Sequence, residues 1–343
     1  MFGRSNKSIR VEVFGKTDLG RTRDHNEDRF LVADLTRKAN SLQTEVRHHT
    51  IGPRGTLLVV ADGMGGAAAG ELASEMATDT IYDHLVKTWN AEEEITPQRF
   101  AYRLKEAVEA ANTSIHAHAK AHPEVRGMGT TTTAAGVLND HLYLTQVGDS
   151  RAYLIRGGEA HQITKDQSLM QRLVEAGELT EEEAAQSERR NIILQALGPD
   201  PRVKVDLTYL PLRRGDLIIL CSDGLSGQVK REEIAEVARA TPDLAQLCAK
   251  LIDLANERGG PDNITAVAAR FEGETLPEPA GEDNAGYQVY PLSEVDTTTE
   301  PVPVYTGSPP PTPIGEKPPV PWWVVAGSLV ALGLGLYFLF LRG

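Results

Sequence analysis

The chain has 343 residues, enough for one large domain or two small ones, and its apolar (41%) and charged (24%) fractions are those of an ordinary globular protein. Its formal charge of -13 argues against a nucleic-acid partner, because backbone phosphates require clusters of Lys and Arg that the sequence does not contain. The two cysteines, Cys221 and Cys248, lack metal-ligand spacing and suggest no disulfide framework, so we expect a reducing compartment.

The first ten residues carry several charges and no apolar run, which argues against a signal peptide and predicts a cytosolic domain. Strand-like runs then recur along the chain, at residues 11–16, 29–33, 56–61, 131–137, 141–147, 152–155, 203–210, 216–221 and 264–270. Helical periodicity fills the intervals, at residues 71–86, 97–121, 231–239 and 244–258, with shorter helices between 167 and 185. Strands separated by paired helices favour α+β layers, because a βαβ repeat requires strict alternation.

Four aspartates stand at the ends of apolar, strand-like runs, namely Asp62, Asp149, Asp223 and Asp262. Strand ends that meet at one edge of a fold bring carboxylates together from distant parts of a sequence. Carboxylate oxygens suit hard cations such as Mg²⁺ and Mn²⁺, whereas zinc sites favour His and Cys. The pattern therefore predicts a site for hard divalent cations.

A polar, turn-rich loop at residues 17–28 completes a set of motifs by which the chain resembles the metal-dependent protein phosphatases, the PPM or type 2C serine/threonine family, in its bacterial form. The resemblance covers residues 11–270, and single Asp-Gly pairs within it mark only turns. In chain order the motifs are Gly-x-x-Arg-x-x-Asn-Glu-Asp at 20–28, Asp-Gly-Met-Gly-Gly at 62–66, Gly-Thr-Thr at 129–131, Gly-Asp-Ser-Arg at 148–151, Ser-Asp-Gly at 222–224 and Asp-Asn at 262–263.

The resemblance implies an αββα sandwich, in which two mostly antiparallel sheets are covered by helices on both outer faces. It also implies two Mn²⁺ or Mg²⁺ ions bridged by Asp62 and a water, with the Gly63 carbonyl on one ion and Asp223 and Asp262 on the other. Asp149, together with Asp223, is expected to hold a third, weaker ion.

Arg23 is expected to bind the substrate phosphate, because a guanidinium pairs with two oxygens at once. Glu27 and Asp28 are expected to orient metal-bound waters through hydrogen bonds. Met64 stands where many eukaryotic members have a His thought to protonate the leaving alcohol, and a thioether cannot do so. Residues 168–197 resemble the mobile flap of bacterial members, although Ser187 replaces a frequent His.

Two other patterns suggest different chemistry. His116, His118 and His122 resemble a metal tract, but their spacing does not place three ligands on one helix face, which favours a solvated helix end. Cys221 suggests a tyrosine phosphatase, which requires an Arg six positions later where this chain has Gly227. We therefore interpret Cys221 as a buried strand residue.

The C-terminal part differs in composition, and the sequence predicts a phosphatase domain at 1–271, a linker at 272–321 and a transmembrane helix at 322–341. The linker contains twelve prolines and nine acidic residues against a single basic one, Lys317, so it cannot bury a core. Its prolines at 309–313 fit a stiff spacer or a polyproline ligand. Residues 322–341 are unbroken apolar or small residues, about the length that spans a bilayer. Gly327, Ala331 and Gly335 form a small-residue stripe compatible with a homodimer through this helix.

Together these features predict a single-pass enzyme on the cytoplasmic face of the cell membrane that dephosphorylates phosphoserine and phosphothreonine in proteins. By family analogy, its partners are phosphorylated proteins and receptor-type serine/threonine kinases, whose action it opposes. The alternative is an inactive pseudophosphatase that keeps the fold and binds phosphoproteins.

Overall fold

The computed structural model describes residues 8–41, 47–280 and 285–292, all within one compact unit. Its strands, in chain order, are β1 (Arg10–Asp18), β2 (Asp28–Asp34), β3 (Ala39–Ser41), β4 (Arg47–Thr50), β5 (Thr56–Met64), β6 (Gly129–Thr130), β7 (Thr132–Leu138), β8 (His141–Val147), β9 (Arg151–Arg156), β10 (Glu159–Gln162), β11 (Asp206–Pro211), β12 (Leu217–Cys221) and β13 (Ile264–Glu272). Its helices are α1 (Ala67–Lys87), α2 (Pro97–Ala121), α3 (Leu169–Glu175), α4 (Glu181–Gln186), α5 (Asp223–Ser226), α6 (Arg231–Ala240) and α7 (Leu244–Glu257), with 3-10 turns at Trp89–Ala91 and Pro123–Val125.

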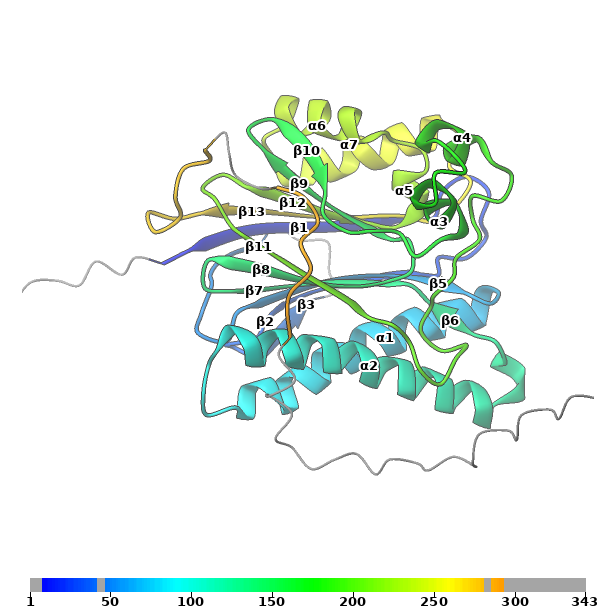
Figure 1. Cartoon of the computed structure of the whole chain (residues 1–343), viewed down its shortest axis with the longest axis horizontal. Helices are drawn as coiled ribbons and strands as arrows, with labels where there is room; N and C mark the ends of the chain where they lie inside the picture. The colour runs from blue at the N-terminus through cyan, green and yellow to red at the C-terminus, as the bar shows by residue number, and fades with distance from the viewer. Residues whose placement is uncertain (1–7, 42–46, 281–284, 293–343) are drawn as a thin grey trace, which may run out of the picture. The chain divides into compact units, whose positions relative to one another are not determined.

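The strands form two stacked sheets with helices on both outer faces (Figure 1). The upper sheet has the order β10-β9-β12-β13-β1-β4 and lies under α6 and α7. The lower sheet has the order β11-β8-β7-β5-β2-β3, with β6 paired to β5, and lies over α1 and α2. Every ladder in the described residues is antiparallel, so the predicted αββα sandwich is confirmed.

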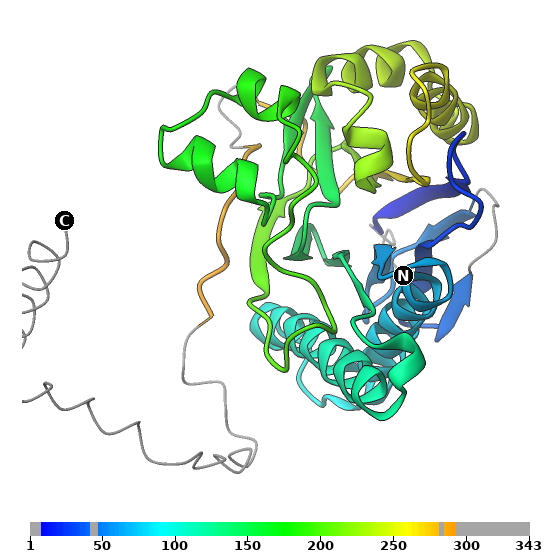
Figure 2. The same cartoon turned by 90° about the vertical axis from the view of Figure 1, so that its right-hand side faces the viewer.

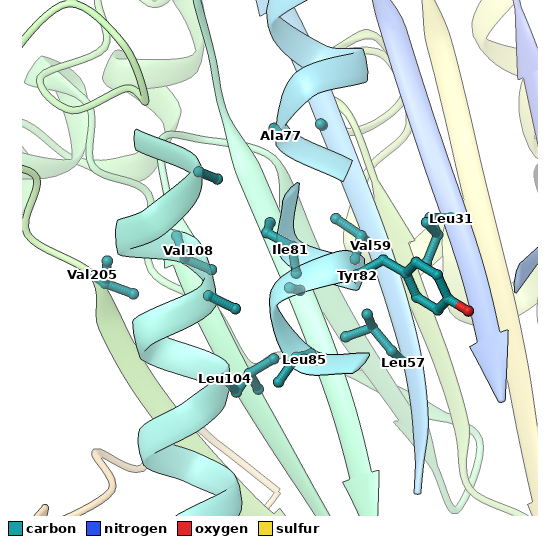
Figure 3. Close-up of a cluster of buried hydrophobic side chains, with 14 of the residues drawn as sticks. Leu31, Leu57, Val59, Ala77, Ile81, Tyr82, Leu85, Leu104, Val108 and Val205 are labelled. Atoms are coloured by element: carbon teal, nitrogen blue, oxygen red, sulfur yellow. The ribbon is translucent and has the colours of Figure 1, made fainter. Parts of the chain in front are cut away.

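Three layers of apolar side chains hold the sandwich together: one between the sheets, and one between each sheet and its helices. Helix α2 begins at an N-cap, Thr96, whose hydroxyl accepts a hydrogen bond from the Arg99 amide, and Pro97 occupies the first turn. From there, Phe100, Leu104 and Val108 recur at helical spacing and are fully buried. Figure 3 shows Leu104 and Val108 of α2, with Ile81 and Leu85 of α1, facing the lower sheet.

The predicted strands and long helices are present, with boundaries that differ by a few residues. The short strands β3, β4, β6 and β10 were not predicted, because runs of two to four residues carry too little periodicity to distinguish. Helix α5, which begins at Asp223, was also not predicted. It contains Gly224 and is followed directly by Gly227, and glycines at such spacing indicate a turn in a sequence.

The packed part of the chain extends beyond the boundary predicted at residue 271. Leu276 and Ala285 are buried between the two sheets. Arg214 holds this stretch, because its backbone amide donates to the Pro277 carbonyl and its guanidinium bonds Glu278 at 2.6 Å. The described chain after β13 is therefore part of the domain and not of the linker.

Residues 285–292, which we call the strap, run along β11, the edge strand of the lower sheet (orange in Figure 2). The Tyr209 amide donates to the Gln288 carbonyl at 3.0 Å, and the Tyr290 amide donates to the Leu207 carbonyl at 2.9 Å. The Tyr290 ring lies edge-on to the rings of Tyr143 and Tyr209. The strap thus satisfies backbone groups that an edge strand otherwise exposes.

In the described residues, no helix has the length and apolar character needed to cross a membrane. The predicted transmembrane helix at 322–341, its stripe at Gly327, Ala331 and Gly335, and most of the predicted linker lie outside those residues. These assignments remain predictions from the sequence.

Removing the strap should destabilise the domain. A chain ending at Ala280 keeps Leu276 but loses the buried Ala285 and the Tyr290 ring contacts, so we expect a lower melting temperature than for a chain ending at Asp296. Tyr290→Ala in the longer chain should cost about 2 kcal/mol, from lost apolar burial and ring contacts. The control is Val289→Ala, because that side chain is 64% exposed. Equal melting temperatures for the two chain lengths would show that the strap adds no stability.

Candidate active site

All the predicted site residues lie at one end of the sandwich, which Figure 2 views face on. They come from five separate segments: the β1–β2 loop, the end of β5, the turn between β8 and β9, the start of α5 and the loop between α7 and β13. The lower sheet supplies Asp28 and Asp62, whereas Asp223 and Asp262 adjoin strands of the upper sheet. The site therefore forms where the two sheets meet.

Asp28 and Asp62 face each other across the antiparallel ladder of β2 and β5. The Asp28 side chain is buried, and its Oδ2 accepts hydrogen bonds from the hydroxyls of Ser222 at 2.7 Å and Thr265 at 2.6 Å. Both hydroxyls belong to the upper sheet or its immediate ends. Asp28 is thus held in place by groups that cross from one sheet to the other.

The backbone of Asp62 is fixed on both sides. Its amide donates to the Thr131 hydroxyl at 3.2 Å, and its carbonyl accepts from the Thr131 amide at 2.8 Å and the Thr130 hydroxyl at 2.9 Å. These bonds leave the Asp62 carboxylate to project from the end of β5. The Gly-Thr-Thr motif therefore acts here by aligning Asp62.

Gly63 follows at a point of close backbone approach. A Cβ there would lie 2.2 Å from the Gly70 carbonyl oxygen of α1, and a Cβ at Gly70 would lie 1.8 Å from Oε2 of Glu27. Only glycine fits at either position. Helix α1, β5 and the buried Glu27 side chain consequently meet at van der Waals distance beside the Gly63 carbonyl.

The loop before β2 is fastened to the loop before β13 by Asn263. Its Nδ2 donates to the carbonyls of Leu19 and His25, both at 2.9 Å, and its Oδ1 accepts from the Glu27 amide at 2.9 Å. Gly20, with φ +81°, passes so close to this loop that a Cβ would lie 2.1 Å from the Asp262 carbonyl. The phosphate-binding candidate Arg23 is thereby set beside the carboxylate cluster.

Arg23 is half exposed, with 48% of its side chain accessible, and its Nη2 forms an ion pair with Asp262 Oδ2 at 2.8 Å. The other Asp262 oxygen accepts the Asn263 amide at 2.8 Å. Asp262 raises the pKa of the Arg23 guanidinium by hydrogen bonding and by its charge. The guanidinium is therefore always charged and sits at the mouth of the cluster, as a phosphate-binding group requires.

Burial and mutual repulsion dominate the electrostatics of the cluster. Burial, and then the charges of Asp223 and Asp262, raise the pKa of Asp28 to about 7, although the Ser222 and Thr265 hydrogen bonds oppose the rise. Burial and the charge of Asp223 raise the pKa of Asp149 to about 8. The pKa values of Asp62 and Asp223 are raised by burial and by the neighbouring carboxylates. Such a cluster ionises fully only in the presence of compensating positive charge.

The donor set fits hard divalent cations, because carboxylates and a backbone carbonyl supply only oxygen. Across the described parts of the chain, however, no three His, Cys, Asp or Glu side chains are oriented so that they hold one ion together. Both oxygens of Asp262 are engaged, by Arg23 and Asn263, and Asp28 is engaged by two hydroxyls. The residues have the right chemistry and position, and completing a coordination shell requires rotation of side chains such as Asp262.

Comparison with known proteins decides the family. A family model described as protein phosphatase 2C matches residues 39–267. The chain belongs to the protein phosphatase 2C family. It is accordingly a metal-dependent serine/threonine protein phosphatase.

Relatives of this phosphatase 2C are bacterial serine/threonine phosphatases. The chain is 35% identical over 252 residues to the serine/threonine phosphatase stp of Listeria monocytogenes, covering 74% of this chain and 92% of that protein. A crystal structure of the serine/threonine phosphatase PstP/Ppp from Mycobacterium tuberculosis superimposes with a TM-score of 0.64 at 37% identity, covering 77% of this chain and 99% of that one. A structure of the PstP catalytic domain in complex with two manganese ions gives a TM-score of 0.62 at 36% identity, covering 77% and 100%.

Several residues that shape the phosphatase site had no predicted role. Ser222, Thr265 and Asn263 hold Asp28 and the β1–β2 loop through side-chain hydrogen bonds over very long sequence separations. Ser222 and Asn263 were visible in the sequence only as neighbours of Asp223 and Asp262. Thr265 lies within a strand-like run, and nothing in the sequence distinguished it from the other residues of that run.

The alternative metal and nucleophile candidates lie in other surroundings. His116 bonds the Gly198 carbonyl at 2.8 Å through Nδ1, and the rings of His118 and His122 stack on each other at 4.0 Å near the end of α2. Cys221 is fully buried in β12, where burial raises the pKa of its thiol to about 12. A thiol with so high a pKa is a poor nucleophile at neutral pH.

The carboxylate cluster predicts a distinctive pH dependence of stability without divalent cations. Because the folded pKa values of Asp28 and Asp149 exceed the ordinary value of an Asp, the folded chain binds more protons than the unfolded chain between about pH 4 and pH 8. Stability should therefore fall as pH rises through this window, by an amount on the order of a few kcal/mol. Thermal unfolding of EDTA-treated protein at a series of pH values measures this, and added Mn²⁺ should restore stability most at high pH.

Asp149→Asn supplies the control, because removing one carboxylate should flatten the pH profile of the cation-free protein. If the cation-free protein instead becomes more stable as pH rises from about 6 to 8, burial and the neighbouring charges do not raise the pKa values of Asp28 and Asp149 as described.

Proposed function

We propose that this phosphatase binds two Mn²⁺ or Mg²⁺ ions through Asp62, the Gly63 carbonyl, Asp223 and Asp262, and that it hydrolyses phosphoserine and phosphothreonine in proteins. The observation that carries the proposal is the convergence of carboxylates from five chain segments at one end of the sandwich, with Arg23 beside them. The manganese-bound PstP structure supports the choice of ion. Asp149 and Asp223 together offer a third, weaker position for a cation.

Divalent ions, when bound, lower the pKa of a water and offset the charge of the phosphoryl oxygens, which is chemistry that side chains of this cluster cannot supply alone. The protein holds its donors in place. The ladder between β2 and β5 sets Asp28 opposite Asp62, and the Ser222 and Thr265 hydroxyls fix the Asp28 carboxylate. Asp28 is thus oriented to accept a hydrogen bond from a water in the site.

Arg23 is the group proposed to bind the substrate phosphate. Its guanidinium is exposed on one side and paired with Asp262 on the other, so it offers donors to an incoming phosphate without leaving the cluster. Glu27, buried against Gly70, is proposed to orient water through its carboxylate. Met64 ends β5 beside the site and carries no proton to give a leaving alcohol, so we assign that proton to a water in the site as the simplest substitute.

The decisive test is hydrolysis of p-nitrophenyl phosphate and of a phosphothreonine peptide, with EDTA, Mg²⁺ or Mn²⁺. We expect turnover that depends on the cation and that falls by more than about a hundredfold in Asp62→Asn and in Asp223→Asn, because direct ligands matter more than their outer-shell partners. Asp253→Asn, an exposed position on α7, is the matched control and should keep full activity. Equal activity in Asp62→Asn and in the wild type would contradict the assignment of the ligands.

The alternative function is a pseudophosphatase that binds phosphoproteins without turnover. The presence of Asp62, Asp223 and Asp262 together favours the enzyme over this alternative. Folded, cation-supplied protein that is inert on both substrates but retains the phosphothreonine peptide would reverse that preference.

We further propose that residues 322–341 anchor the domain to the cytoplasmic face of the membrane and that the enzyme opposes receptor-type serine/threonine kinases there. The support is the apolar composition and length of these residues. Confinement to the membrane raises the effective concentration of the enzyme toward membrane-bound phosphoproteins. Pairing through the stripe of Gly327, Ala331 and Gly335 belongs to the same proposal.

Cell fractionation tests the anchor. The full chain should sediment with membranes and resist extraction by high salt, while a chain ending at Asp296 should stay in the soluble fraction. A full chain that high salt releases from membranes would exclude an integral helix, since salt weakens only electrostatic attachment.

A further inference from the structure

The flap, defined as residues 168–197, is joined at its base to the turn before Asp149 by the backbone and side chain of Gln167, a residue that the proposed mechanism does not use. Gln167 lies between β10 and the N-cap of α3, Ser168, and it is half buried. Its backbone carbonyl accepts the Leu194 amide at 2.7 Å, so it bonds the returning end of the flap as well as preceding the outgoing end. Gln167 therefore sits where both ends of the flap meet the domain.

The same residue grips the turn that carries Asp149. The Gln167 amide donates to the Gly148 carbonyl at 2.8 Å, and the Gly148 amide donates to Gln167 Oε1 at 3.0 Å. Gly148 adopts φ +99°, and a Cβ there would lie 2.6 Å from Thr131 Cγ2, so the turn has little freedom of its own. A reciprocal pair of hydrogen bonds thus fixes the residue directly before Asp149.

The other end of the Gln167 amide reaches the lower sheet. Its Nε2 donates to Asp206 Oδ2, at the start of β11, at 2.9 Å. The donor is directed to a charged acceptor, which makes this bond stronger than one between neutral groups. The Gln167 side chain consequently bridges the Asp149 turn and the edge strand.

A buried hydrogen-bond network continues from this turn to Asp62. Gln146 Nε2 donates to the Gly148 carbonyl at 3.1 Å and to the Ser150 carbonyl at 2.7 Å. The Ser150 and Thr131 hydroxyls lie 2.7 Å apart, and Thr131 holds the Asp62 backbone. The flap root, the Asp149 turn and Asp62 therefore belong to one connected polar network.

We propose that Gln167 is a positioning residue that couples the base of the flap to Asp149 and so sets the geometry of the cation-binding carboxylates. The expected effect on turnover rests on the proposed function. The expected effects on Mn²⁺ affinity and on the flap rest only on the hydrogen bonds of Gln167. Gln167→Ala removes the bond to the Gly148 amide and the bond to Asp206 together. The backbone bonds of Gln167 to the Gly148 carbonyl and to the Leu194 amide remain, so the Asp149 turn keeps its backbone link to the flap but loses its side-chain link to β11.

The test compares full-length wild type, Gln167→Ala and the control Gln171→Ala, each purified in a mild detergent. Gln171 lies on α3, four residues away, and its side chain contacts only the exposed Glu175, at 3.2 Å, among the hydrogen bonds described. The readouts are kcat and KM for a phosphothreonine peptide, Mn²⁺ affinity by calorimetry, and the rate of trypsin cleavage at Arg189 and Arg190 within the flap. Melting temperatures correct each readout for the unfolded fraction.

We expect Gln167→Ala to lower kcat or Mn²⁺ affinity by about 10- to 100-fold, as loss of an outer partner of a metal ligand does, with KM changed little. Trypsin should cleave its flap several times faster, and Gln171→Ala should match wild type throughout. If Gln167→Ala matches Gln171→Ala in kcat, Mn²⁺ affinity and cleavage rate, the proposal is overturned.

Exchanging the donor and the acceptor of the Gln167–Asp206 hydrogen bond distinguishes a positioning role from a general loss of stability. Gln167→Glu keeps an acceptor for the Gly148 amide but places a carboxylate against that of Asp206, so it should be as damaging as Gln167→Ala. Adding Asp206→Asn returns a donor to this contact, with its direction reversed, and should restore most of the lost kcat and Mn²⁺ affinity. Failure of the double change to restore either quantity, at a melting temperature equal to that of wild type, would also overturn the proposal.

A wild-type protein without phosphatase activity would count against the proposed function but not against the positioning role of Gln167. In that event Mn²⁺ affinity and flap cleavage decide: changes confined to Gln167→Ala support the positioning role, and unchanged values reject it.

Discussion

The burial of several carboxylates beside one another is the constraint on which the rest of this structure depends. Removal from water, and then repulsion by the neighbouring carboxylates, raises the pKa values of Asp28, Asp62, Asp149 and Asp223. Left to itself, such a group of side chains would turn outward to water or keep its protons. The fold therefore has to oppose the repulsion with fixed backbone and hydroxyl groups, and the resulting concentration of negative oxygens is what gives the site its demand for cations.

The sandwich can hold these carboxylates close together because they are divided between its two sheets. Asp28 and Asp62 come from paired strands of the lower sheet, whereas Asp223 and Asp262 adjoin β12 and β13 of the upper sheet. The Ser222 and Thr265 hydroxyls cross between the sheets to reach Asp28. The relative position of the sheets, set by the apolar layer between them, is thus also the relative position of the ligands.

Features of the site that depend on neighbouring residues in the sequence could be predicted, whereas features that depend on distant residues could not. Asp62, Asp149, Asp223 and Asp262 were predicted because an Asp that borders an apolar run is a local pattern, and the remaining roles came with the family resemblance. The hydroxyl partners of Asp28 are separated from it by 194 and 237 residues, and only the stacking of the sheets brings them near. The strap was missed for a different reason. Its composition predicts a linker, but it pairs with β11 mainly through backbone groups that nearly any sequence provides.

The strap also changes the geometry of the proposed membrane anchor. If the domain ended at residue 271, fifty residues would separate it from the apolar segment that begins at Trp322. Because the chain is packed on β11 as far as Leu292, only residues 293–321 remain to bridge that gap, and even fully extended they reach at most about 100 Å. The tether leaves from the edge of the sandwich that also carries the flap root, since β11 contacts Gln167 through Asp206. The reach of a membrane-anchored enzyme of this design would be limited by that length together with the size of the domain itself.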